Sequence, residues 1–342
     1  MKIRDDILMY AKIAQQDLGY VAGQIEVTSK CFQHCKYCSS WRDKNYNQEM
    51  SFKQMIDFVS HHLFKFPAFE HLTLTGGDPQ AWRPLDCFLG WWQNERYPDD
   101  IDLQISTALA RNIKNPKLWR NVIKDLRVSI DASSAEMYQK IRGDNENTAN
   151  TVLARLVVLE HPTLAIITTM YPDNIKELTA LLWSLDNLYQ KGLKIRKVIV
   201  MAGIGVELND EFWEEWDKTM LWALESLKVP TSFGDSIIET REICNTLGIQ
   251  TVQCWASKLG FHIKPNGDVY PCCLIGGEAI KVKKEFCIGN IFELNLFDIY
   301  KRHQALSYYA TQPKICRKIC QFKQLQINLA GELANETKLA IP

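Results

Sequence analysis

The chain has 342 residues, of which 46% are hydrophobic and 23% are charged, and both values are typical of a globular protein. Forty basic side chains balance forty acidic ones, so the net charge is zero and the basic excess of a nucleic-acid binder is absent. No stretch approaches the roughly 20 apolar residues of a membrane span, and the start lacks the apolar core of a signal peptide. The sequence therefore predicts a cytoplasmic protein with neither a nucleic acid nor a membrane as partner.

Residues 20 to 230 alternate short apolar runs with amphipathic stretches, and polar residues, Gly or Pro separate them. The predicted strands, in chain order, are Gly23–Thr28, His71–Thr75, Asp102–Ser106, Leu126–Ile130, Leu164–Met170 and Lys197–Met201. The predicted helices are Ser51–Leu63, Pro84–Asn94, Ser134–Ile141, Ala149–Leu159, Asn174–Tyr189 and Asn209–Leu227. Successive strand–helix units predict an α/β fold with a parallel sheet, either open or curled towards a barrel, and ligands at the carboxyl ends of its strands.

The pattern changes after about residue 231, where helical periodicity fades and Cys, Gly and Pro become frequent through Cys320. We interpret Val229–Ser236 as a linker region. The predicted organisation is an N-terminal extension over 1–19, a barrel domain over 20–230, a small cysteine-rich domain over 231–325 and a tail over 326–342.

Eleven cysteines are many for a reducing compartment, where clustered cysteines bind metal more often than they form disulfides. Three lie between Cys31 and Cys38, and seven lie between Cys244 and Cys320. The remaining residue, Cys87, stands alone, and we interpret it and Cys244 as small buried hydrophobic residues. The cysteines thus mark two metal-binding regions.

The segment Cys31-Phe32-Gln33-His34-Cys35-Lys36-Tyr37-Cys38 directly follows the first predicted strand. Three thiolates spaced C-x3-C-x2-C can bind three irons of a cubane and leave the fourth iron without a protein ligand. A zinc knot or a group of buried thiols is the alternative. Zinc knots usually take four ligands from paired motifs, and His34 would be an awkwardly placed fourth.

This segment resembles the hallmark of the radical S-adenosylmethionine (SAM) superfamily, C-x3-C-x-aromatic-C, with Tyr37 in the aromatic position. The resemblance implies that Cys31, Cys35 and Cys38 hold a [4Fe–4S] cluster whose open iron is chelated by SAM. It further implies that Tyr37 packs near the adenine. The implied fold is a partial (β/α)6 TIM-like barrel.

Three further strand ends resemble SAM-binding motifs of this family. Gly76-Gly77-Asp78-Pro79 resembles Gly-Gly-Glu-Pro, whose carboxylate accepts a hydrogen bond from the SAM amino group, although Asp78 is one methylene shorter. The next strand ends in Ser106 and Thr107, hydroxyl residues that either contact SAM or make local turn bonds.

The segment Val128-Ser129-Ile130-Asp131, followed eleven residues later by Arg142-Gly143, resembles the Ser-Ile-Asp…Arg-Gly pattern of members with SPASM or twitch extensions. In that pattern Ser129 and Asp131 face the SAM ribose or carboxylate. Arg142 pairs with the carboxylate through the rigid, forked set of N–H donors of its guanidinium. The alternative role for Arg142 is a surface salt bridge.

The second cysteine region contains Asn266-Gly267 between strand-like runs, which predicts a hairpin that folds Cys272 back towards Cys254. The spacing resembles the opening of the SPASM extension, and the shortened remainder resembles a twitch domain with one auxiliary cluster. The resemblance implies a second [4Fe–4S] cluster on four thiolates, with Cys273 and Cys287 as competing ligands. The implied ligands are Cys254, Cys272, Cys316 and Cys320.

Together these resemblances imply a radical SAM oxidoreductase. An external one-electron reductant of flavodoxin or ferredoxin type would drive cleavage of SAM to methionine and a 5′-deoxyadenosyl radical, which removes a hydrogen atom from a substrate carbon. The auxiliary cluster would accept a second electron, so the net reaction is a two-electron oxidation, a dehydrogenation or a cross-link. Zero net charge and one small extension favour a small-molecule substrate. The alternatives are a ribosomally made peptide as substrate, or a non-catalytic iron–sulfur or zinc protein.

Overall fold

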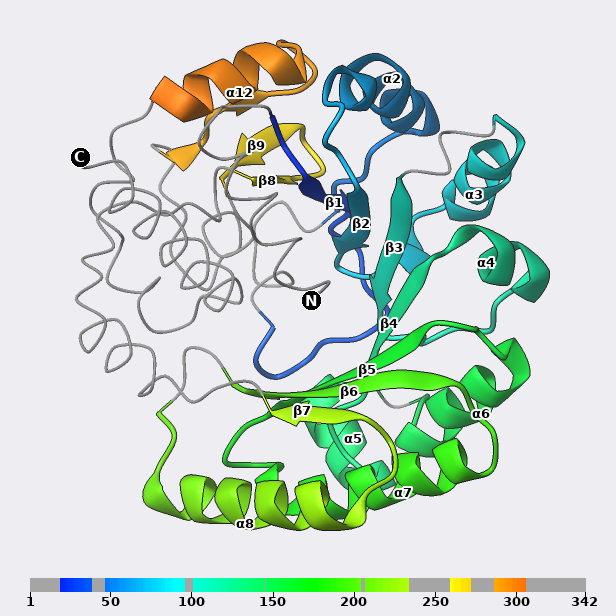
Figure 1. Ribbon diagram of the computed structural model, residues 1–342, viewed down its shortest axis with the longest axis vertical. Helices are drawn as coiled ribbons and strands as arrows, with labels where there is room; N and C mark the ends of the chain where they lie inside the picture. Colours follow the sequence, from blue (N-terminus) through cyan, green and yellow to red (C-terminus); the bar gives the residue numbers. More distant parts are fainter. Residues whose placement is uncertain are drawn as a thin grey trace, which may run out of the picture. The chain divides into compact units, whose positions relative to one another are not determined.

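The computed structural model describes residues 19–38, 47–95, 101–144, 146–203, 207–233, 259–271 and 286–305 (Figure 1). The chain divides into two compact units that interleave along the sequence. One unit takes Met1–Ile25, Met50–Leu72 and Ser236–Pro342, and the other takes Glu26–Glu49 and Thr73–Asp235. Strands β1 (Ala22–Thr28) and β2 (His71–Gly76) each begin in the first unit and end in the second.

The second unit is a parallel α/β unit whose sheet continues from β2 in the order β3-β4-β5-β6-β7 (Figure 1). Each strand from β4 to β7 pairs in parallel with the strand before it. The strands are β3 (Asp102–Thr107), β4 (Asp125–Ser129), β5 (Leu164–Met170), β6 (Ile195–Ala202) and β7 (Thr231–Phe233). The connecting helices are α3 (Leu85–Asn94), α4 (Pro116–Val122), α5 (Ala135–Arg142), α6 (Ala149–Leu159), α7 (Leu178–Gln190) and α8 (Asp210–Ser226), with short 3-10 turns at Pro79–Ala81 and Ile175–Glu177.

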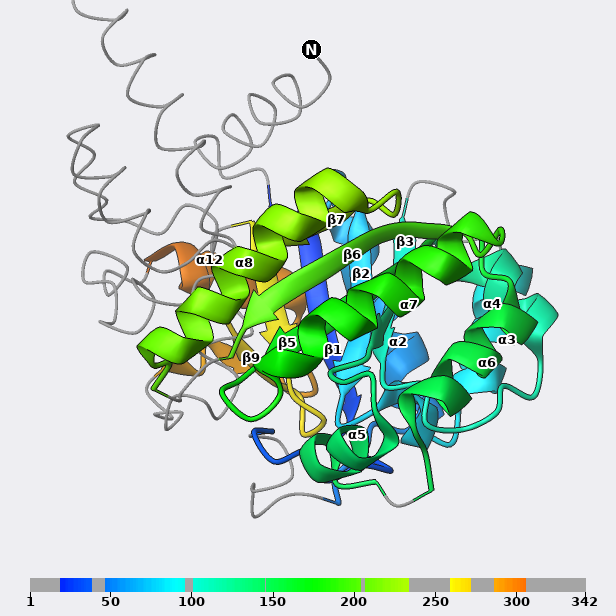
Figure 2. The same ribbon diagram turned by 90° about the horizontal axis from the view of Figure 1, so that it is seen from below.

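The two faces of this sheet differ in polarity. On β4, Leu126 and Val128 are completely buried, whereas Arg127 between them is only half-buried. On β6, Val198 is completely buried, and Ile199 after it is half-buried. Because successive side chains of a strand point to opposite faces, the apolar face packs against the helices and the other face stays polar and partly open. Helices α7 and α8 lie side by side over the apolar face (Figure 2).

The first unit joins the start of β1 to a small hairpin sheet. Strand β8 (Gly260–Ile263) pairs in parallel with β1, and β9 (Asp268–Tyr270) pairs antiparallel with both β8 and β10 (Gly289–Asn290). The predicted hairpin at Asn266-Gly267 is confirmed, since Gly267 turns the chain with a φ of 88°. The unit also contains α2 (Phe52–His62), a 3-10 turn at Leu63–Lys65, and α12 (Leu296–Ala305).

The predicted α/β class is confirmed, and every predicted strand is present. Several elements differ from the prediction: α4 and α12 are further helices, β10 is a further strand, and β7 lies inside the segment interpreted as a linker. Cys87 is exposed, so its interpretation as a buried residue is wrong. The predicted domain boundaries stay a prediction. Within the described ranges, no helix is long and apolar enough to cross a membrane.

Candidate functional site

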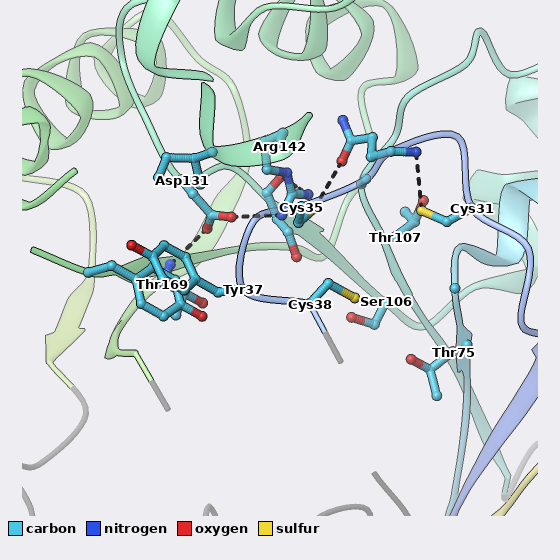
Figure 3. A pocket seen from close by; sticks show the side chains of 17 residues that line it. Cys31, Cys35, Tyr37, Cys38, Thr75, Ser106, Thr107, Asp131, Arg142 and Thr169 are labelled. Atoms are coloured by element: carbon cyan, nitrogen blue, oxygen red, sulfur yellow. Dashed lines mark hydrogen bonds and ion pairs between the residues drawn. The ribbon is translucent and has the colours of Figure 1, made fainter. Parts of the chain in front are cut away.

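A cavity of about 250 Å³ opens in the second unit at the carboxyl ends of strands β2 to β5 (Figure 3). Four hydroxyl side chains at successive strand ends contribute to its wall: Thr75, Ser106, Ser129 and Thr169. The loop after β1 and the end of α5 supply most of the remaining wall. The other lining residues are Cys31, Gln33, Cys35, Tyr37, Cys38, Gly76, Gly77, Thr107, Ala108, Asp131, Ile141, Arg142 and Tyr171.

The cavity brings together all the residues predicted to bind the first cluster or SAM, with the exception of Asp78. Parallel strands place their carboxyl ends at one edge of a sheet, which explains why motifs far apart in the sequence meet there. The role of each residue towards a cluster or SAM stays a prediction, because the structure shows placement and not ligation.

The two glycines at the end of β2 allow a close approach of backbone to backbone. Gly76 has a φ of 138°, and a Cβ on it would lie 2.1 Å from the carbonyl oxygen of Thr28. A Cβ on Gly77 would lie 2.3 Å from the carbonyl oxygen of Lys30. The Gly77 N–H donates to the same Thr28 oxygen at 2.8 Å, so this turn is fixed to the end of β1, three residues before Cys31. Any side chain at either position would separate the two loops.

Asp78 is buried and joins two strand ends. Its carboxylate accepts hydrogen bonds from Thr107 Oγ1 at 2.6 Å, from the Ala108 N–H at 3.2 Å and from the Gln80 N–H at 3.0 Å. Burial raises the pKa of Asp78 above the usual value of an aspartate, although these three donors counteract the shift. The side chain therefore holds in place Thr107 and Ala108, which line the cavity.

The loop that carries Cys31, Cys35 and Cys38 rests on the C-terminal end of α5. The His34 N–H donates to the Arg142 carbonyl at 3.0 Å, and the Lys36 N–H donates to the Ile141 carbonyl at 2.8 Å. All three thiols are partly exposed and free of disulfides. Burial, the largest cause, raises the pKa of Cys31 to about 12 and that of Cys35 to about 11, so both are protonated in the bare protein. Metal binding would displace those protons.

Gln33, which the motifs do not single out, is buried beneath the same loop. Its Nε2 donates to Tyr138 Oη at 3.1 Å and to Asp144 Oδ2 at 2.9 Å. The Oε1 lies 4.0 Å from Cys35 Sγ, and the Gln33 backbone N–H donates to Cys31 Sγ at 3.4 Å. Gln33 thus fixes the loop to helix α5 and to the segment after it while it faces the thiols.

Arg142 and Asp131 form a buried ion pair at the cavity wall, drawn as a dashed line in Figure 3. Arg142 Nη1 lies 2.7 Å from Asp131 Oδ2, and the other Asp131 oxygen accepts from the Thr169 N–H at 2.8 Å. Burial disfavours the charge of Arg142, but the nearby Cys35 and Asp131 hold its pKa above the usual value. Arg142 is only 7% exposed, so it does not form the surface salt bridge that the sequence allowed.

The Nε of Arg142 is a buried donor for which the described part of the chain supplies no hydrogen-bond partner. A buried N–H without a partner costs about 1 to 3 kcal/mol. Arg142 lines the cavity, so a small shift of its side chain would let an anionic group there satisfy this donor, which suits a carboxylate-bearing ligand.

The far end of the cysteine loop is fixed to the loop between β5 and α7. The rings of Tyr37 and Tyr171 stack with centroids 3.8 Å apart and an interplanar angle of 15°. Tyr37 Oη and Lys36 Nζ both donate to Asp173, and these bonds depress the pKa of Asp173 to about 2. Tyr171 directly follows a buried strand, and that position at a strand end is the sequence signal that could have identified it.

The residues present fit an iron–sulfur cluster with a chelating amino-acid ligand. Three thiols lie in one eight-residue loop, two glycines let the end of β2 pack closely against the start of that loop, and Arg142 offers an unused donor. In the described ranges no three His, Cys, Asp or Glu side chains are close enough to share a single metal ion, whereas a cubane distributes its thiolates over separate irons. Fold and site together are compatible with a cluster-dependent, SAM-binding α/β enzyme.

Comparison with known families gives the assignment. The family model of the radical SAM superfamily matches residues 25–215, and that of the SPASM iron–sulfur cluster-binding domain matches residues 254–321. The chain belongs to the radical SAM superfamily. This superfamily uses a [4Fe–4S] cluster with SAM, and the SPASM domain binds auxiliary iron–sulfur clusters, which confirms the predicted cofactors.

Solved structures support the same fold. SuiB from Streptococcus suis superposes with a TM-score of 0.65 and 14% identity, and the match covers 90% of this chain and 74% of SuiB. The structure of anSMEcpe with bound AdoMet gives a TM-score of 0.60 and 14% identity, over 90% of this chain and 88% of that one. A further match, to ribosome-binding factor A of Streptomyces griseus, is 29% identical over 114 residues, spans 29% of this chain and 70% of that protein, and defines no shared family.

The predicted ligands of the auxiliary cluster, Cys254, Cys272, Cys316 and Cys320, lie outside the described residues, as does the competing Cys273. The other competitor, Cys287, is described: it is partly exposed and its Sγ donates to the Gly289 carbonyl at 3.3 Å.

Proposed function

We propose that this radical SAM enzyme binds its first cluster on Cys31, Cys35 and Cys38, cleaves SAM reductively and oxidises its substrate by two electrons. The observation that supports this proposal is the cavity in which those three thiols share a wall with the strand-end motifs and with the unpartnered Arg142 Nε. Cluster and SAM, when bound, supply a 5′-deoxyadenosyl radical that removes a hydrogen atom from a substrate carbon.

The chain's own residues orient SAM in this proposal. Arg142 donates from Nε to the SAM carboxylate, while its Nη1 stays paired with Asp131. Ser129 and Asp131 face the ribose or carboxylate, and the Tyr37 ring lies beside the adenine, with Tyr171 stacked behind it. Gly76 and Gly77 form part of the wall beside the cysteine loop, and Ser106 and Thr107 contribute hydroxyls.

The electron balance requires two partners besides the substrate. A flavodoxin- or ferredoxin-type reductant would supply the electron that cleaves SAM. An auxiliary [4Fe–4S] cluster, when bound, would accept the electron that the substrate radical gives up as it releases a proton to solvent. The SPASM match over residues 254–321 supports such a cluster. We propose Cys254, Cys272, Cys316 and Cys320 as its ligands, and we place the reaction in the cytoplasm.

A polypeptide is the substrate class that the structural relatives favour. SuiB has been solved with its precursor peptide SuiA, and anSMEcpe with the Cp18Cys peptide, at TM-scores of 0.65 and 0.60 to this chain. We propose a dehydrogenation or cross-link of a ribosomally made peptide. The small molecule that the neutral charge balance favours is the second candidate.

The test compares anaerobically reconstituted chains. With a reductant and SAM, the intact chain should form 5′-deoxyadenosine, and the triple variant with Ala at residues 31, 35 and 38 should form none. Cys87→Ser is the matched control, because Cys87 is exposed and outside the cavity, and it should keep full iron content and activity. Replacing Cys254 or Cys272 with Ala should remove about half of the iron, as expected for one of two cubanes, and leave uncoupled SAM cleavage. Deoxyadenosine formation by the triple variant would refute the proposal.

A further inference from the structure

A row of four paired residues crosses the open face of the sheet, from Ser106 at the cavity to Lys197 near the amino end of β6. Parallel pairing places Arg127 of β4 next to Ser106 of β3 on one side and next to Ala165 of β5 on the other. Ala165 pairs in turn with Lys197 of β6. Paired residues of a parallel sheet point to the same face, and Ser106 lines the cavity. Arg127 and Lys197 therefore lie on the cavity face, with the small Ala165 between them.

The distances along this row are short. Neighbouring strands are about 4.8 Å apart, so Arg127 is one strand spacing from a cavity-lining residue and about 10 Å from Lys197. Both side chains are long enough to reach a common group above the methyl of Ala165. The alternation of burial agrees with this placement, because Val128 and Val198 beside them are completely buried on the opposite face.

Arg127 has unused donors. Its Nε donates to Asp125 Oδ2 at 2.8 Å and its Nη2 donates to Gln104 Oε1 at 2.7 Å, which leaves Nη1 without a bond in the described structure. The side chain of Arg127 is 31% exposed. Arg127 is thus held in a fixed orientation and remains accessible.

The local charge is positive. Asp125 is shared between Arg127 and Arg196, whose Nη2 lies 2.7 Å from Asp125 Oδ1. The ammonium of Lys197 has no ion-pair partner among the described residues. On β4 and β6 this part of the sheet therefore holds three cationic side chains against one carboxylate.

Building on the proposed function, we propose that Arg127 and Lys197 bind a carboxylate of the substrate and so present the neighbouring substrate carbon to the cavity. A planar guanidinium held by two acceptors is suited to a carboxylate, and a nearby ammonium adds a point charge. This anion site is separate from the one at Arg142, which belongs to SAM in the proposed function. The substrate class is consequently an acidic one: a peptide with a carboxylate near the modified residue, or a small carboxylic acid.

The test uses the full chain, anaerobically reconstituted and saturated with SAM. Three acidic probes represent the three sources of a carboxylate: N-acetylglutamate N-methylamide for a peptide side chain, N-acetylglycine for a peptide C-terminus and succinate for a free acid. Each is compared with its neutral amide in ligand-observed NMR titrations, which measure millimolar affinities. At least one acid should bind about tenfold more tightly than its amide.

Arg127→Gln and Lys197→Gln should each weaken binding of that acid by about tenfold, and Arg127→Lys should retain part of it. Lys194→Gln is the charge-matched control, because Lys194 is exposed just before β6 and should have no effect. Lys197→Gln also serves if Arg127→Gln fails to fold, since Lys197 supports no ion pair in the described structure.

Equal binding of every acid and its amide, or unchanged binding by both Gln variants, would overturn this proposal. The same intact chain is assayed for 5′-deoxyadenosine. If it forms 5′-deoxyadenosine but shows no preference for an acid, the carboxylate site alone is wrong; if it forms none, the proposed function itself has failed.

Discussion

Gly143 holds the cysteine loop against helix α5, and replacing it with Ala tests whether this docking orders the cluster ligands. Gly143 ends α5 with a φ of 57°, in the left-handed region. A Cβ on it would lie 2.3 Å from the carbonyl oxygen of His34, which is part of the cysteine loop. Ordinary carbon–oxygen contacts begin at about 3.3 Å, so the loop would have to move by about 1 Å.

The free-energy cost can be worked from these contacts. A left-handed conformation costs a non-glycine residue about 1 to 2 kcal/mol. Displacing the loop also breaks the backbone hydrogen bonds from His34 to Arg142 and from Lys36 to Ile141, each worth about 1 kcal/mol. The sum is about 3 to 4 kcal/mol, of which about 2 kcal/mol comes from bonds of the cysteine loop. A misplacement of about 1 Å at a cofactor site is enough to lower activity by about a hundredfold.

Gly192→Ala is the matched control, because Gly192 has a φ of 102° but no atom within 4 Å of the point that a Cβ would occupy. Both variants hold an alanine at a positive φ, so both should lose thermal stability. Only Gly143→Ala should lose iron at the first site and bind SAM more weakly. The assays are iron content after anaerobic reconstitution, SAM binding by equilibrium dialysis and the thermal unfolding midpoint. If Gly143→Ala loads iron and SAM as fully as Gly192→Ala does, loop docking on α5 is not what positions the thiols.

Three further predictions concern single side chains of the site. The pKa of Asp173 is depressed from 3.8 to about 2, so its carboxylate stabilises the fold above about pH 4 and this contribution is lost as the pH falls towards 2. Between pH 4 and pH 2 the thermal unfolding midpoint of Asp173→Asn should therefore fall less than that of the unaltered chain. If both midpoints fall equally over this interval, the depressed pKa of Asp173 is wrong. Gln33→Leu should cost about 2 to 3 kcal/mol and lower the iron content, whereas Gln190→Leu, which removes a similar bond to Asp186 far from the cavity, should leave iron unchanged. Asp78→Ala should weaken SAM binding by at least about tenfold in dialysis while iron content is kept; a parallel loss of both would show that Asp78 supports the cluster loop instead.

The sequence predicts the elements that local signals define. Leu164–Met170 and Ala149–Leu159 have the predicted bounds, because an apolar run defines the strand and Thr148 caps the helix with a reciprocal bond to Thr151. Helix α4 is missed because two turns are too short for a periodicity to be recognised, and β7 because three residues give no strand pattern. The motif residues meet at one edge because the sheet is parallel.

Contacts between distant segments could not be predicted from the sequence. The anchoring of Gln33 to Tyr138 and Asp144 depends on how the cysteine loop lies on α5, and no local pattern encodes it. The row of Arg127 and Lys197 depends on register. A β-bulge between Leu164 and Ala165 shifts the pairing so that Lys197, and not Arg196, lies opposite Ala165. A shift of one residue exchanges which side chain faces the cavity.

The central claim is that the first cluster has an open iron that SAM chelates, and electron paramagnetic resonance tests it most directly. Anaerobically reconstituted chain, with Cys254 and Cys272 replaced by Ala so that one cluster remains, is reduced and measured with and without SAM. The account predicts a paramagnetic [4Fe–4S]⁺ signal that changes when SAM is added. No such signal after reduction, or a spectrum that SAM leaves unaltered, would contradict it.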